Sequence, residues 1–425
     1  MTGVDATTTT SLPDQTEDFL GEASFLWLQR AYASLAPNYS PNQLADLDER
    51  LAAHIDGLRV AESDGWSSVE SGLDNGGPED FFPAAVLALE AQDGRFDDLL
   101  VRLTDTPEAI PGVISALGWV SASYLGGRVK SMLEDPSPLK QKLGIAACAL
   151  HRKDPGPALN RCLASTVDSV RIRALRAAGE LGRMDVMPLL RAALGDPKPE
   201  VCFWAAWSAV LLGDRALALE TLVRVGLSPG RRQLSALQLA LQAMDANAGH
   251  ELLMELDEAS QGPRLRIVGF GFIGDPSYVP WLIEQVAKPA IARIAAEAFV
   301  NITGADFNRE PLESLPPDGF DEGPTEDPDD ENVELPEDIA LPWPDVERMR
   351  AWWQKNNGGF QAGQRYFLGE PPSVPRCTRI LQEGFQRQRI AAALYLSLLQ
   401  PGRILFPTSA PAWRQARLLA AVEAE

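Results

Sequence analysis

The segment Leu139 to Arg152, LKQKLGIAACALHR, recurs along the chain at intervals of 31 residues. It lies over VRIRALRAAGELGR at residues 170–183, over VCFWAAWSAVLLGD at 201–214 and over RQLSALQLALQAMD at 232–245. Its central small pair, Ala146 and Ala147, falls on Ala177 and Ala178 after one shift. A constant period of this size is typical of a stacked array, in which each unit covers the apolar face of its neighbour. We therefore expect an array of repeated helical units.

The register of the repeat extends in both directions. It reaches residues 84–85 weakly upstream and continues, with a slip of about one residue, through residues 292–304. This predicts an array over residues 77–304 with two helices in each unit. The run Gly195-Asp196-Pro197 should end one helix, because glycine favours helix ends and proline restricts the residue before it. Pro199 and Glu200 should begin the next helix.

The repeat resembles helical repeats of the HEAT and PBS-lyase type. The residues that carry the resemblance are Val170-Arg171, Arg173-Ala174 and the closing pair Leu181-Gly182. The resemblance implies a HEAT-like α-solenoid, and the sequence favours a right-handed one with negligible strand content. The alternative is an ordinary helical bundle with coincidental alanines, which five or more units in near-constant register disfavour.

Helical patterns also flank the array. Ser40 followed by Pro41 is a typical helix start, and an apolar stripe at helical spacing follows it: Leu44, Leu47, Leu51, Ile55 and Leu58. We expect a disordered tail over residues 1–17, an N-terminal helical cap over 18–76, an acidic Pro/Gly-rich loop over 305–345 and a C-terminal helical region over 346–425. The predicted fold class is therefore all-α.

The negative charge of the chain is concentrated in one segment. The formal net charge is -21, and residues 305–345 hold 15 acidic residues and one arginine, which leaves about -7 for the rest of the chain. Such acidity repels nucleic acid phosphates, so we expect a basic protein partner and no nucleic acid. No apolar run approaches the roughly 20 residues that span a bilayer. The polar N-terminus does not resemble a signal peptide, and four cysteines without CxxC spacing fit a reduced, cytoplasmic location.

The motifs of common catalytic sites do not occur with the required context. The three histidines, His54, His151 and His250, are far apart and each falls in a different predicted unit. The run GFGFIG at residues 269–274 matches GxGxxG by letter, but the repeat places it inside a helix instead of between a strand and a helix. We therefore expect no catalytic residue, no metal site and no cofactor.

The candidates for partner binding form three groups. An acidic cluster could attract a basic partner, although it could also be a solvated loop, and it lacks the spacing of a calcium loop. Arginines on the repeat helices could hold an acidic partner or the acidic segment of the chain itself, or could be solvated or paired. Tryptophans at the end of that segment and after it could bind a partner or fix the C-terminal region to the array. The candidates are Asp327, Asp329, Asp330, Glu331, Arg171, Arg173, Trp343, Trp352 and Trp353.

The two ends of the chain resemble a proteobacterial family of HEAT-like proteins that is often encoded beside type VI secretion genes. The resemblance rests on short motifs spread over nearly the whole chain: FLWLQR at 25–30, LDER at 47–50, His54 to Leu58, Gly65-Trp66, LPWPD at 341–345, Trp352-Trp353, GQRY at 363–366, QRQR at 386–389 and APAWRQ at 410–415. The family has no established catalytic residues. What the resemblance implies is a setting of effectors, immunity proteins and loading adaptors.

These observations lead to three hypotheses for function. The first is a non-enzymatic, protein-binding solenoid of a type VI secretion cluster, an immunity protein that binds and neutralises a basic secreted effector such as a nuclease. The second is an adaptor that loads an effector onto the secretion spike. The third is a HEAT-like enzyme, such as a DNA glycosylase or a bilin lyase. The acidity of the chain disfavours a glycosylase, which needs a basic concave face.

Overall fold

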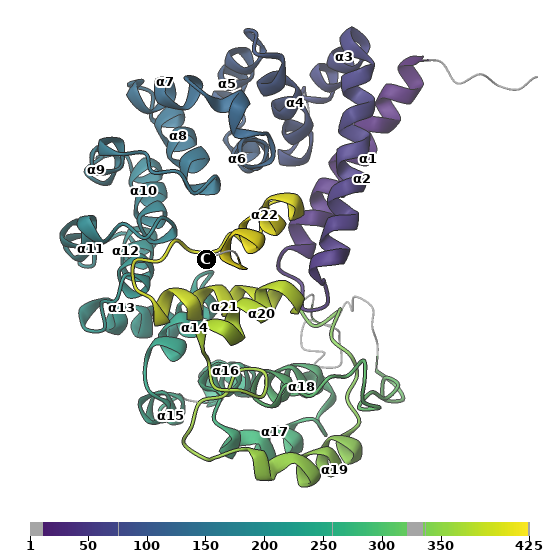
Figure 1. Cartoon of the computed structure of the whole chain (residues 1–425), viewed down its shortest axis with the longest axis vertical. Helices are drawn as coiled ribbons and strands as arrows, with labels where there is room; N and C mark the ends of the chain where they lie inside the picture. The colour runs from purple at the N-terminus through teal and green to yellow at the C-terminus, as the bar shows by residue number, and fades with distance from the viewer. Residues whose placement is uncertain (1–11, 75, 257, 321–334, 336, 424–425) are drawn as a thin grey trace, which may run out of the picture. The chain divides into compact units, whose positions relative to one another are not determined.

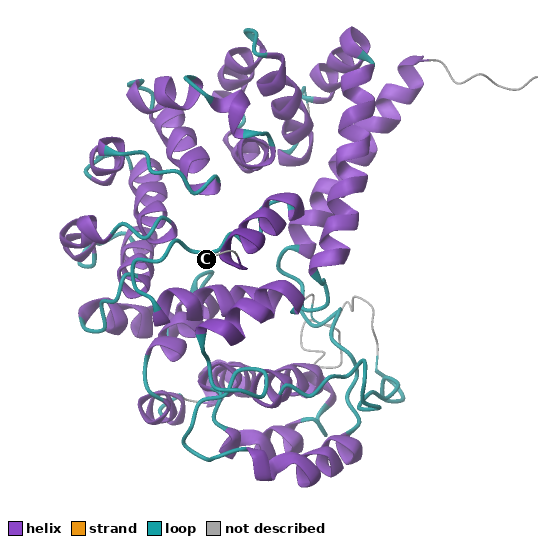
Figure 2. Ribbon diagram, viewed as in Figure 1, coloured by secondary structure: helices purple, strands orange, loops and turns teal. Residues whose placement is uncertain are grey.

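The structure is a computed structural model, which describes residues 12–423 except residues 75, 257, 321–334 and 336. The described part contains 22 α-helices and a few short 3-10 turns (Figure 1). It contains no strand, only two isolated β-bridges, and loops connect the helices (Figure 2). The all-α prediction is therefore confirmed.

The predicted array consists of helix pairs. It begins with α4 (Pro78–Ala91), and in each later pair the second helix carries the repeated small residues. The pairs are α5 (Arg95–Asp105) with α6 (Ile110–Trp119), α7 (Arg128–Glu134) with α8 (Pro138–Leu150), α9 (Pro157–Leu163) with α10 (Asp168–Glu180), α11 (Met187–Ala193) with α12 (Pro199–Leu211), α13 (Leu217–Gly226) with α14 (Gln233–Ala243), α15 (Ala246–Met254) with α16 (Glu258–Ile273), and α17 (Val279–Gln285) with α18 (Pro289–Thr303).

Small residues let the second helices of neighbouring units approach closely. Helices α4, α6 and α8 pack in succession, and so do α12, α14, α16 and α18. Ala178 is fully buried, and the backbone N–H of Gly179 donates to Ser208 Oγ at 3.2 Å. A Cβ placed on Gly271 would lie 3.1 Å from Ala298 Cα, so a larger residue there would push α16 from α18. The run GFGFIG thus lies at the end of α16, with Gly274 directly after the last helical residue, as the repeat register predicted.

The N-terminal cap is formed by α1 (Leu12–Ala33), α2 (Pro41–Val60) and α3 (Glu62–Gly72). Ser40 caps α2 in a capping box with Gln43, and the apolar stripe of α2 is buried. The expectation of a disordered tail over residues 1–17 needs correction, since α1 already begins at Leu12. Thr16 is buried and its hydroxyl accepts a hydrogen bond from Ser68 Oγ at 2.7 Å, which holds this first turn against α3. Residues 1–11 lie outside the described part.

Contacts divide the chain into two compact units. Unit 1 contains residues 1–35, 39–177 and 407–425, and unit 2 contains residues 36–38 and 178–406. The division falls within α10, inside the array. The end of the chain is also divided: α19 (Val346–Asn356), α20 (Val374–Glu383) and α21 (Gln386–Leu399) belong to unit 2, and α22 (Ala412–Glu423) belongs to unit 1.

Candidate functional site

A row of glycines in unit 2 brings the C-terminal segment onto the ends of the repeat helices. Gly182, Gly274 and Gly304 follow α10, α16 and α18, and each has a positive φ that favours glycine. A Cβ on these residues would lie 2.1–2.4 Å from a backbone oxygen of Gly402, Tyr366 or Leu368, respectively. The repeat glycines therefore end their helices and also make room for the backbone of the C-terminal segment.

Arg365 fixes this segment to two helices at once. Its guanidinium donates to the carbonyl of Leu241 at 2.7 Å, to that of Met244 at 2.8 Å and to that of Gln242 at the end of α14. Its Nε donates to the carbonyl of Ile273 at 3.0 Å, at the end of α16. A cation at these positions is favourable, because the last carbonyls of a helix carry its negative dipole end.

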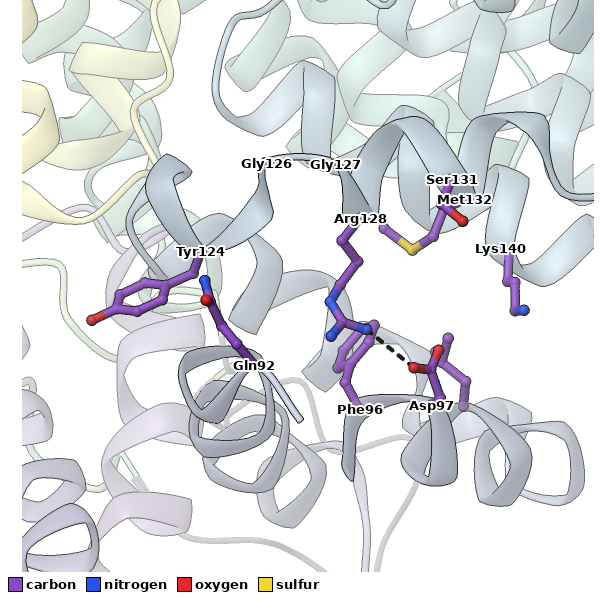
Figure 3. Close-up of a pocket in the computed structure, with 11 residues that line it drawn as sticks. Gln92, Phe96, Asp97, Tyr124, Gly126, Gly127, Arg128, Ser131, Met132 and Lys140 are labelled. Carbon is purple, nitrogen blue, oxygen red and sulfur yellow. Dashed lines mark hydrogen bonds and ion pairs between the residues drawn. The ribbon is translucent and has the colours of Figure 1, made fainter. Parts of the chain in front are cut away.

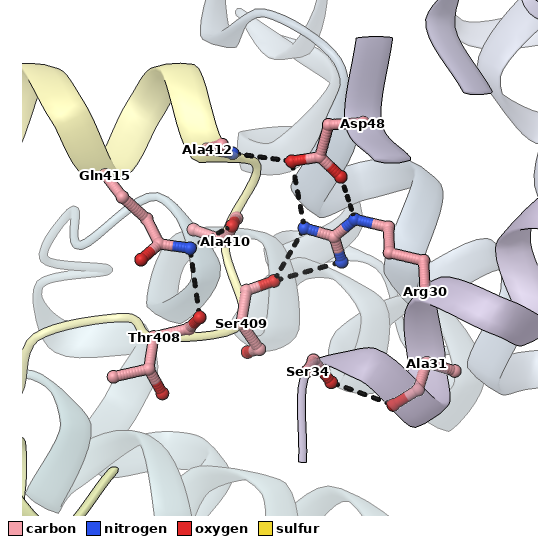
Figure 4. Close-up of polar contacts among 9 residues, drawn as sticks. All are labelled: Arg30, Ala31, Ser34, Asp48, Thr408, Ser409, Ala410, Ala412 and Gln415. Carbon is pink, nitrogen blue, oxygen red and sulfur yellow. Dashed lines mark hydrogen bonds and ion pairs between the residues drawn. The ribbon is translucent and has the colours of Figure 1, made fainter. Parts of the chain in front are cut away.

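The last helix is held in unit 1 by a comparable polar network (Figure 4). Arg30 on α1 forms an ion pair with the buried Asp48 on α2 and donates to the carbonyl of Ser409 at 3.2 Å. Asp48 also accepts from the backbone N–H of Ala412 at 2.6 Å. Arg414 donates to the carbonyl of Gly118 at 2.6 Å, at the end of α6. Three motifs that carry the family resemblance thus meet in one structural contact.

Trp413 also belongs to this contact. Its ring meets Trp119 edge-to-face at a centroid distance of 4.6 Å. The chain itself thus covers the end of α6 in unit 1 and the ends of α10, α14, α16 and α18 in unit 2. Arginine and tryptophan often bind partner molecules. In this structure Arg365, Arg414 and Trp413 instead have a structural role.

The acidic segment is fixed at its base in unit 2. Glu313 and Pro344 form an isolated antiparallel bridge, and the Ser314 N–H donates to the carbonyl of Trp343 at 2.8 Å. The Trp343 ring packs edge-to-face on Phe320 at 4.6 Å, and the guanidinium of Arg293 lies 4.7 Å from its centroid. Trp343 therefore holds the two ends of the acidic segment together.

Two further arginines hold Glu337 and Asp338 of the acidic segment. Arg264 on α16 donates to Asp338 at 2.8 Å, and Arg387 on α21 donates to the carbonyl of Glu337 at 2.6 Å. Arg387 also pairs with Glu297 on α18 at 3.0 Å. Arginines on the repeat helices could hold the acidic segment, hold an acidic partner, or be solvated or paired; among these alternatives, Arg264 pairs with Asp338 of the acidic segment. The candidates Asp327, Asp329, Asp330 and Glu331 lie outside the described residues.

The other predicted residues take structural positions. Trp352 and Trp353 on α19 are half-buried and pack against the core around α17 and α18. Trp352 meets Phe299 edge-to-face at 5.6 Å. Arg171 and Arg173 lie on α10 in unit 1, where Arg171 is half-buried and Arg173 is buried. These positions favour the anchoring interpretation of the tryptophans and leave Arg173 little surface to offer a partner.

The cysteines are buried and His151 is half-buried. All four cysteines are free and buried, and burial raises the pKa of Cys148 and Cys377 to about 11, so both are protonated thiols at neutral pH. The ring of His151 donates to the carbonyl of Leu117 at 2.8 Å. Burial, together with the charge of Arg414, lowers the pKa of His151 to about 4. No group of three or more potential metal ligands occurs among the described residues.

A cleft of about 400 Å³ lies between α5 and α7 in unit 1 (Figure 3). Phe96 and Met132 line its apolar part. Arg128 lies over the Phe96 ring at 5.1 Å and pairs with Asp97 at 3.4 Å, while Lys140 pairs with Asp135 at 2.9 Å. Because both cations are matched by carboxylates, this arrangement is typical of a solvated gap between repeat helices instead of a catalytic site.

An exposed apolar seam on α1 was missed by the sequence analysis. Phe25 is 57 % exposed, Leu28 48 %, Tyr32 46 % and Leu35, in the turn after the helix, 63 %. The signal that could have found it is the spacing of three, four and three residues. That signal is masked in the sequence because the buried residues Leu26 and Trp27 interrupt it.

Comparison with known proteins agrees with the architecture. Residues 156–242 match the family of HEAT repeats, and this span runs from α9 to α14. No curated protein matches the chain. The structure is an all-α solenoid of HEAT-like repeats, a class that generally mediates protein–protein interaction. None of the helices within the described residues is both long enough and apolar enough to cross a bilayer.

Proposed function

We propose that this chain is a non-enzymatic protein-binding solenoid of a type VI secretion cluster that neutralises a cognate effector as its immunity protein. The observation that carries the proposal is the charge of the acidic segment, about -14 of the total -21, on a loop fixed at its base by Arg264, Arg293 and Arg387. A fixed acidic loop suits a basic partner, because complementary charge speeds encounter and selects against wrong partners.

The structural use of the reactive side chains supports a binding function over catalysis. The thiols of Cys148 and Cys377 are protonated, the ring of His151 is occupied by a backbone carbonyl, and the cations of the cleft are matched. Arg30, Arg365 and Arg414, which lie in motifs that carry the family resemblance, bind backbone or carboxylate groups of the chain itself. An enzyme of the glycosylase type would instead present a basic nucleic-acid surface.

The test is protection from a toxin. The effector gene adjacent to this gene is expressed in a sensitive host with and without the chain. We expect the chain to restore growth of the host. We also expect the two purified proteins to associate directly. Toxicity that the chain leaves unchanged would remove the immunity proposal.

An adaptor is the second candidate, because an acidic binding surface also suits loading of a basic effector onto the secretion spike. Deleting the gene separates the two functions. Loss of an immunity protein leaves secretion intact and exposes the cell to its own effector. Loss of an adaptor stops secretion of the effector and leaves the cell unharmed.

A further inference from the structure

The exposed apolar seam of α1 has the spacing of a coiled-coil interface. Phe25, Leu28, Tyr32 and Leu35 follow one another by three, four and three residues, which is the alternation of the a and d positions in a heptad. We call these four residues the α1 seam. Single exposed apolar residues are common on proteins, but a line of four large ones marks an interaction surface.

The α1 seam faces away from the core of unit 1. The opposite face of α1 is buried through Ala23, Leu26, Trp27 and Ala33, and the helix packs on α2, α3 and α4. The core contacts of α1 are therefore made without the seam. Because α1 packs on three other helices through its buried face, the large apolar residues on its exposed face add no packing contacts within unit 1.

The heptad before the seam is acidic. Asp18 occupies the a position, Glu17 the preceding g position and Glu22 the e position, and all three are exposed. In coiled coils the e and g charges set partner choice and orientation. A partner helix that covers the seam therefore meets three carboxylates at one end and four apolar side chains at the other.

These charges argue against a second copy of the chain as the partner. A parallel pair of α1 helices would set the carboxylates of one copy against those of the other. An antiparallel pair that sets seam on seam would place Phe25 against Leu35 and carry Asp18 past the end of the other α1, so the acidic end would gain no partner from that helix. An amphipathic helix with apolar a and d residues and a basic end satisfies both parts of the surface.

We infer that the α1 seam and its acidic end bind an amphipathic helix whose far heptad is basic. This inference rests on the proposed function, since it names the surface and the chemistry by which a basic protein partner is held. The apolar seam retains the partner, while the carboxylates of Glu17, Asp18 and Glu22 attract and orient it.

The experiment uses the full chain and a fluorescein-labelled peptide of three heptads. Two heptads carry Leu at a and d, and the third carries Lys at a, e and g, to lie against the acidic end. A twin peptide carries Glu in place of these lysines. Binding is followed by fluorescence anisotropy at two salt concentrations.

The chain variants are Phe25→Gln with Leu28→Gln, and Asp18→Asn with Glu22→Gln. The matched control is Val60→Gln with Val101→Gln, two exposed apolar residues of unit 1 outside the seam.

We expect the seam variant to weaken binding of the lysine peptide at least tenfold and the control to leave it unchanged. The acidic-end variant should slow association and reduce its salt dependence. The glutamate twin should bind at least tenfold more weakly than the lysine peptide. Equal binding by the seam variant and the wild-type chain, or of the two peptides, would overturn the inference.

The toxicity assay separates this inference from the proposed function. If the seam variant still protects a host fully, the function stands and the surface is wrong. If even the wild-type chain fails to protect while the seam variant loses the peptide, the function is wrong and the surface stands.

Discussion

At the scale of single residues, the repeat glycines serve two purposes, and Gly274→Ala should separate them. Gly274 has φ +77°, and an added Cβ would lie 2.1 Å from the carbonyl oxygen of Tyr366. Gly363 has nearly the same backbone conformation, φ +79°, with no atom within 4 Å of its added Cβ. Gly363→Ala should therefore cost only the left-handed strain, about 1–2 kcal/mol. Gly274→Ala should cost about 1–3 kcal/mol more, because the segment must move.

Urea unfolding of both variants measures this difference. Equal losses in the two variants would mean that the close approach of Tyr366 to Gly274 contributes nothing to the stability of unit 2. A larger loss in Gly274→Ala assigns the excess to that approach, since the two backbones differ little in φ.

His151 should make stability depend on pH. Burial and the charge of Arg414 lower its pKa from 6.5 to about 4, so the folded protein keeps a neutral ring while the unfolded chain takes a proton below about 6.5. Stability should therefore fall as the pH drops from 6.5 towards 4. In the His151→Gln variant, the loss of stability that His151 causes between pH 6.5 and 4 should disappear. The check is the unfolding midpoint in urea at several pH values, and parallel curves for the two proteins would contradict the assignment.

At the scale of elements, Arg365 should be a main attachment of the C-terminal segment. It makes four hydrogen bonds to carbonyls of α14, α16 and the turn after α14. Arg365→Met leaves these carbonyls without a charged donor and should destabilise unit 2 by about 2–4 kcal/mol. Arg379→Met, at an exposed position on α20, is the matched control and should stay within about 0.5 kcal/mol of wild type. Differential scanning calorimetry measures both, and equal midpoints would exclude this role.

The sequence predicts the helices well, but it does not predict which segments pack on the ends of these helices. Pro199 begins α12, Ser40 caps α2 and the apolar stripe of α2 is buried, because proline, caps and apolar periodicity act within a few residues. The partners of Arg365 could not be found in the same way. They are backbone carbonyls more than 90 residues away, and every residue carries such an acceptor. The second role of Gly274 was hidden for the same reason, since a helix end explains the glycine without any distant segment.

The candidate residues show the same limit. The sequence favoured an anchoring role for Trp343 and Trp352 but left a binding role open, because a tryptophan suits both interfaces and cores. Burial decides between the two, and burial depends on contacts such as Trp352 with Phe299, which the sequence does not specify. The α1 seam was overlooked for the converse reason. Its residues look like core residues, and only their exposure shows otherwise.

At the scale of the whole molecule, charge distribution sets how a partner approaches. Residues 305–345 carry about two thirds of the net charge of -21, and the described base of this segment is already neutralised in part by Arg264, which pairs with Glu337 and Asp338. Charge that is paired with the array steers a partner less than charge that is not. The steering part of the segment is therefore expected among the acidic residues between the two ends of the base.

Replacing Asp327, Asp329, Asp330 and Glu331 by Asn or Gln should slow the association with a basic partner. Opposite charges outside the buried contact raise the encounter rate more than they hold the complex, so the association rate should fall about tenfold while dissociation changes little. The loss should shrink as salt rises, because screening acts over about 8 Å at physiological ionic strength. Stopped-flow kinetics at low and high salt measure both effects. The variant with Asp98→Asn, Asp105→Asn, Glu108→Gln and Glu134→Gln, which removes the same number of charges from exposed positions of the array instead of the segment, is the control. Equal association rates for this control and the segment variant would assign steering to the net charge of the chain, and an unchanged rate in the segment variant would make the loop a solvated linker.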